Sequence, residues 1–182
     1  MIRDDIKWSD VKEQFQNATP FHHVAIDNFF LPEIAEQISK EFPDFNDNTL
    51  NVYDNQIEKK KTGNSWDKFS KTTYNAFTYL SRDYFTSAMR FLTDESDLYM
   101  DVGLHGGGWH MHGPGGNLNV HLDYNIHPKL NEQRKLNIII YMTPEWNNAW
   151  GGGLELWTND PVTNQPERFD KLVDNVYNRA VI

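Results

Sequence analysis

The spacing of apolar residues changes about half-way along this chain. Up to about residue 96, apolar side chains recur at intervals of three or four positions, which predicts helices. After Asp97 they fall in short runs separated by glycine-containing turns, which predicts strands. We therefore expect an α+β fold in one domain spanning 1–182, with mainly helical support in 1–96 and the strands in 97–182.

Three helical segments are expected in the first half. Ser9 or Asp10 can cap a helix that runs to about Ala18. Pro32 suits the first turn of a second helix, and Pro43 ends it. That helix has one apolar stripe, formed by Ile34, Ile38 and Phe42. Residues 66–92 carry a third, longer stripe of aromatic and aliphatic side chains, which we expect to back a sheet.

The segments between these helices have a different character. Residues 21–30 are rich in aromatic and branched side chains, which predicts a strand. Residues 44–64 are polar and include three consecutive lysines at 59–61. We expect a long loop there, with the basic run on its surface.

Five short apolar segments in the second half are expected to form strands. Strands at this spacing suggest a sandwich or barrel. The segments are 98–104, 115–123, 135–144, 152–157 and 175–182.

Composition narrows the classes of protein that fit. The net charge of -9 argues against nucleic acid or an anionic membrane as a partner, and favours a small-molecule or peptidyl substrate. The chain has no cysteine, so thiolate metal sites and cysteine nucleophiles are excluded. The first residues lack the apolar segment of a secretory signal, and the run 138–142 is too short to span a bilayer. We expect a cytoplasmic protein, and the oligomeric state stays open.

The segment His121-Leu122-Asp123 is the strongest chemical signal. Side chains two residues apart on a strand point to the same side, so His121 and Asp123 would aim an imidazole and a carboxylate at one point. With one further histidine, such a pair forms the 2-His-1-carboxylate set of non-haem Fe(II) oxygenases. No histidine follows His127 in this chain.

Several segments around this pair resemble the prolyl 4-hydroxylase-like branch of the Fe(II)/2-oxoglutarate dioxygenases. The chain looks closest to the type that includes ribosomal-protein prolyl hydroxylases. The similar segments are HLDYN at 121–125, RKLNIIIYMTPEWNNAWGGGLELW at 134–157, NVYNRAVI at 175–182 and, more generically, VAIDNFFLPEIAEQISKEF at 24–42.

The resemblance implies a fold, an activity and a set of cofactors. It implies a double-stranded β-helix, also called a jelly roll, and an Fe(II)- and 2-oxoglutarate-dependent hydroxylase, with ascorbate as a candidate additional cofactor. His121 and Asp123 would be the first two iron ligands and the catalytic residues. Because related halogenases free the carboxylate position for halide, Asp123 favours hydroxylation.

Two further groups expected from the resemblance are not found in the sequence. The distal histidine ligand and the basic residue that pairs with 2-oxoglutarate would both lie beyond Ile182. If the chain lacks that C-terminal end, we expect weak iron binding, little or no turnover of 2-oxoglutarate and an unpaired strand edge at 175–182.

Candidate cosubstrate contacts are His112, Asn137 and Tyr141. The resemblance places a tyrosine nine residues before the first ligand, where this chain has His112. Asn137 and Tyr141 are polar positions in an alternating apolar run, so both could line the pocket. Tyr141 could equally be a core aromatic residue with a tethered hydroxyl.

Two alternative functions stay open. One is a noncatalytic jelly-roll binding module that has lost its third ligand. The other is a cupin-like metal enzyme that uses His110, His112 and His121. His127 precedes a proline and is expected in a loop.

Overall fold

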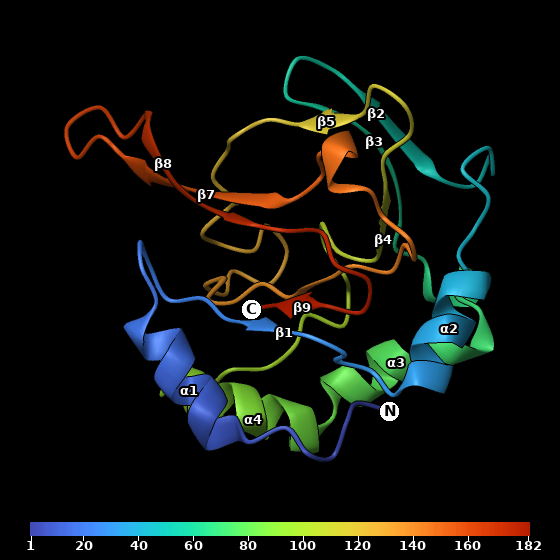
Figure 1. Ribbon diagram of the computed structural model, residues 1–182, viewed down its shortest axis with the longest axis horizontal. Helices are drawn as coiled ribbons and strands as arrows, with labels where there is room; N and C mark the ends of the chain where they lie inside the picture. The colour runs from blue at the N-terminus through green and yellow to red at the C-terminus, as the bar shows by residue number, and fades with distance from the viewer.

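The computed structural model describes residues 1–182 and contains four α-helices and several small antiparallel sheets. The helices lie together on one side of the molecule and most strands lie on the other (Figure 1). The mixed α+β class agrees with the prediction. A double-stranded β-helix is not seen, because the strands are short and divide among three separate sheets.

The helices occupy the predicted segments. They are α1 (Trp8–Asn17), α2 (Pro32–Lys40), α3 (Lys71–Ser81) and α4 (Asp83–Thr93), with 3-10 turns η1 (Trp66–Lys68) and η2 (Asn148–Trp150). The first cap was predicted wrongly. The N-cap residue of α1 is Lys7, which makes no side-chain cap bond, so neither Ser9 nor Asp10 holds that position.

The three-stranded sheet joins distant parts of the chain. Its order is β1 (Ala25–Ile26), β9 (Ala180–Val181) and β6 (Ile139–Ile140), all antiparallel. The last strand therefore lies in the centre of this sheet. The expected unpaired edge at 175–182 is wrong, because β9 has a partner on both sides.

A second sheet lies where a long loop was expected. It contains β2 (Asn51–Asp54), β3 (Glu58–Gly63), β4 (Trp109–Met111) and β5 (Asn117–Leu118). The Asn55 side chain accepts hydrogen bonds from the backbone N–H groups of Ile57 and Glu58, which closes the β2–β3 hairpin. All four residues of β2 are exposed, so the apolar alternation that signals a strand is absent.

The third sheet is the hairpin of β7 (Leu154–Asn159) and β8 (Pro166–Val173), which projects from the molecule (Figure 1). β8 was not predicted, since it is almost entirely exposed. Conversely, the strand expected at 98–104 is a loop. The Asp101 carboxylate accepts bonds from the backbone N–H groups of Gly103 and His105 and holds the chain in turns.

The main hydrophobic core joins the helices to the three-stranded sheet. Its sixteen buried residues include Phe29 and Leu92, both completely buried. Burying a side chain of this size contributes about 2–3 kcal/mol relative to leaving it exposed. Ala180 and Ile182 belong to the same core, so the last residues are held by the helical layer. None of the helices is long and apolar enough to cross a membrane.

Candidate functional site

His121 and Asp123 are close together, as their spacing predicts. The distance between His121 Nε2 and Asp123 Oδ1 is 3.7 Å. Each side chain exposes between a third and a half of its surface, so both are open to solvent and to small ligands. The two atoms are near enough to share one metal ion after a small movement, because Fe–N and Fe–O bonds are about 2.1 Å long, as for Zn²⁺.

The His121 ring is held in the tautomer that a metal ligand needs. Its Nδ1 lies 2.7 Å from the backbone oxygen of Asn119, which can only accept, so Nδ1 donates. The lone pair is therefore on Nε2, the nitrogen that faces Asp123. A backbone acceptor on the second ring nitrogen is the usual support of a metal-binding histidine.

The backbone that carries this pair is not the strand that was expected. β5 ends at Leu118, and residues 119–123 have no regular structure. Asn119 still donates its backbone N–H to the oxygen of Ile57, so the segment follows β3 for one more residue. The pair is thus anchored at the end of β5.

A loop brings a cation to Asp123. Residues 124–134 fold back on themselves through an Ile126–Gln133 bridge and a bond from the Arg134 backbone N–H to the Asn125 oxygen. Arg134 Nη2 lies 3.0 Å from Asp123 Oδ2. The sequence analysis missed Arg134, since its only signal is a charge directly before an apolar run.

His112 lies just after β4 in a group of charged and titratable side chains. Antiparallel pairing places Thr62 opposite His110, which puts Lys60 near His112 on the same face of the sheet. Lys60 Nζ is 2.7 Å from Glu58 Oε2, and both side chains are largely buried. Desolvation by neighbouring atoms, the larger cause, and the Lys60 charge lower the pKa of both histidines, although both residues keep part of their surface exposed.

Asn137 and Tyr141 are not in a strand, because β6 contains only Ile139 and Ile140. Asn137 is exposed. Tyr141 is partly buried and packs on the small cluster of Leu156, Val173 and Val181. Burial raises the pKa of the Tyr141 phenol.

No group of three or more histidine, aspartate or glutamate side chains lies close enough to hold a metal ion. His110, His112 and His121 are therefore not assembled into a ligand set. His127 lies in a loop, as expected. It is buried, and its Nδ1 accepts backbone N–H bonds from Lys129 and Leu130.

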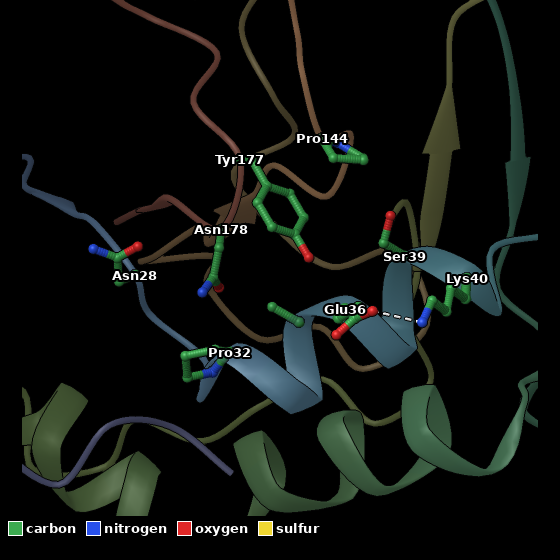
Figure 2. Close-up of a pocket in the computed structure, with 9 residues that line it drawn as sticks. Asn28, Pro32, Glu36, Ser39, Lys40, Pro144, Tyr177 and Asn178 are labelled. Carbon is green, nitrogen blue, oxygen red and sulfur yellow. Dashed lines mark hydrogen bonds and ion pairs between the residues drawn. The ribbon is translucent and has the colours of Figure 1, made fainter.

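A surface hollow of about 490 Å³ lies away from this pair, between α2 and the chain leading into β9. In Figure 2 the Tyr177 side chain points toward α2, where Glu36 and Lys40 form an ion pair. Neither His121 nor Asp123 lines this hollow.

The sequence profile of one family matches the part of the chain that carries the pair. Residues 107–182 match the 2OG-Fe(II) oxygenase superfamily. No curated protein matches the chain. The matched segment contains β4 to β9 with His121, Asp123 and Arg134, whereas the four α-helices lie outside the match.

The donor atoms fit part of what such an oxygenase needs. An imidazole nitrogen and a carboxylate oxygen are two of the three protein ligands in its iron site. The oriented His121 ring and the open position of Asp123 suit that role. A third protein ligand is not among the residues around them.

Proposed function

We propose that the protein is an Fe(II)- and 2-oxoglutarate-dependent hydroxylase of the prolyl 4-hydroxylase type. The observation that carries the proposal is the tautomer of His121, whose free Nε2 lone pair faces the Asp123 carboxylate at 3.7 Å. The resemblance of 121–125 and 134–157 to that type supports the finer assignment.

In this proposal the protein residues bind and orient, and the bound cofactors perform the oxidation. Bound Fe(II) would let 2-oxoglutarate and dioxygen yield succinate and carbon dioxide, with the second oxygen atom inserted into a substrate C–H bond. His121 and Asp123 would hold the metal. His112, Asn137 and Tyr141 are the candidates for contacting 2-oxoglutarate, and ascorbate belongs in the assay.

The first prediction concerns the metal ligands. His121→Ala and Asp123→Ala should each weaken Co(II) binding at least tenfold, since each removes one donor. Both should abolish succinate formation from 2-oxoglutarate while leaving the far-UV circular dichroism unchanged, because both side chains are exposed. Calorimetric titration and a succinate assay provide the two measurements.

His22→Ala is the matched control, because His22 is exposed and belongs to the N-terminal part outside the oxygenase match. It should bind Co(II) and form succinate like the unaltered protein. Undiminished Co(II) affinity in both ligand variants would overturn the proposal. Assays with a proline-containing peptide and with free amino acids would then separate the prolyl hydroxylase type from other hydroxylases.

A further inference from the structure

Arg134 contacts one of the two oxygen atoms of the Asp123 carboxylate. Its Nη2 lies 3.0 Å from Oδ2, whereas His121 Nε2 faces the other oxygen, Oδ1. The two oxygens of Asp123 therefore have different environments before any ligand binds.

The guanidinium is itself held in place. It lies over the Tyr124 ring, 4.8 Å from the ring centre. The Tyr124 hydroxyl donates to the backbone oxygen of His105 at 3.0 Å, which ties the ring to the glycine-rich loop before β4. The backbone bond from Arg134 to Asn125 fixes the other end of the side chain.

A rigid support matters here because Asp123 has little support of its own. It lies in a segment without regular structure, and nearly half of its side chain is exposed. A free carboxylate there could rotate or bind a metal through both oxygens. A planar guanidinium that already lies over an aromatic ring loses little further freedom when it forms its ion pair.

We propose that Arg134 is a positioning residue that occupies Asp123 Oδ2 and leaves Oδ1 as the single oxygen available to the metal. The proposal rests on the proposed function, since it concerns the same two ligands. Tyr124 belongs to this support because it carries the guanidinium. A carboxylate that binds through one oxygen leaves more coordination positions free for 2-oxoglutarate and dioxygen.

Arg134 could instead affect metal binding through its positive charge alone, and that role predicts the opposite change in metal affinity. A cation next to a metal site repels a second cation, so removing it would strengthen metal binding. A positioning role predicts that removing Arg134 weakens metal binding, because the Asp123 carboxylate then loses its orientation. The two roles therefore differ in the sign of the change in affinity.

The test is a Co(II) titration of the metal-free full chain by calorimetry. Arg134→Gln should bind Co(II) roughly tenfold more weakly, at the low end of the range for residues that orient metal ligands. Arg134→Lys keeps the charge but loses the planar guanidinium that lies over the Tyr124 ring, so it should also weaken Co(II) binding, by a smaller factor. Tyr124→Leu should weaken binding, whereas Tyr124→Phe keeps the ring and should do so less.

Arg168→Gln is the control, since Arg168 forms a similar ion pair with Asp170 on β8, and it should leave Co(II) affinity unchanged. Equal or tighter binding by Arg134→Gln would overturn the positioning role. If the Gln variant fails to fold, Arg134→Lys and Tyr124→Leu decide the matter by the same criterion. Co(II) affinity of the unaltered chain that does not depend on His121 would instead overturn the proposed function and the positioning role with it.

Discussion

The buried side chain of Asn178 joins two distant segments of the chain through hydrogen bonds to the backbone of Phe30. Its Oδ1 accepts the backbone N–H of Phe30 at 2.9 Å, and its Nδ2 donates to the Phe30 oxygen at the same distance. Both bonds are buried, and they tie the approach to β9 to the start of α2. The backbone of Asn178 also has a positive φ of 59°, which asparagine tolerates better than most residues.

The prediction for this residue is a large loss of stability. Asn178→Ala should lower the free energy of unfolding by about 2–4 kcal/mol, since it leaves two buried backbone groups without partners. Asn164→Ala is the control, because Asn164 has a similar φ of 55° but is exposed at the tip of the β7–β8 hairpin. Urea denaturation of both variants gives the comparison, and equal losses would contradict the role of the buried bonds.

A second residue-level prediction concerns the histidines beside Lys60. Burial first, and the Lys60 charge second, lower the pKa of His110 in the folded protein. The unfolded chain therefore takes up a proton at higher pH than the folded protein does. Stability is full above about pH 6.5 and falls as the pH decreases from there toward the lowered pKa.

His110→Gln removes this titrating group, so its stability should change less between pH 7 and pH 5.5 than that of the unaltered protein. Lys60→Met should raise the His110 pKa toward its ordinary value, which NMR titration of the imidazole ring would detect. An unchanged pH dependence in His110→Gln would show that the histidine does not contribute.

The sequence predicts that the side chains of His121 and Asp123 lie close together but gives little sign of Arg134, for a physical reason. The first two are neighbours because only Leu122 separates them, and this holds even though the strand that was expected there is absent. Arg134 reaches Asp123 only because 124–134 folds back on itself. Such closure depends on contacts across the loop and leaves no periodic pattern.

Among the elements, helices were predicted far better than strands. The stripe of α2 is local, and its apolar residues contact the core wherever the rest of the chain lies. The β2–β3 hairpin has no such signal, since β2 is exposed along its whole length. The jelly roll was expected from a resemblance, and strands of two residues, such as β5, β6 and β9, do not build one here.

At the scale of the whole molecule, β9 connects the two halves of the chain. It pairs with β1 on one side and β6 on the other, and Arg179 forms an ion pair with Asp27 across the sheet, at 2.5 Å. Ala180, Val181 and Ile182 are all buried. β9 thus belongs to the segment that matches the oxygenase superfamily and also packs against the helical layer.

The prediction at this scale is that β9 is indispensable for a cooperative fold. Deleting 180–182 should remove both pairings of the three-stranded sheet and leave a chain without a sharp unfolding transition. The control replaces residues 161–164, at the exposed tip of the β7–β8 hairpin, with Asn-Gly, a good two-residue turn. That variant should unfold cooperatively near the original midpoint in thermal denaturation, and a similar transition in the deletion variant would contradict the prediction.

The central place of β9 also determines when this protein can fold in a cell. A ribosome synthesises β1 long before β9, so the three-stranded sheet cannot close until synthesis has passed Val181. The helices α1 and α4 can pack against each other earlier, but the core that they share is not complete until Ala180 and Ile182 are in place. Until β9 has been synthesised, the nascent chain therefore carries uncovered apolar surface.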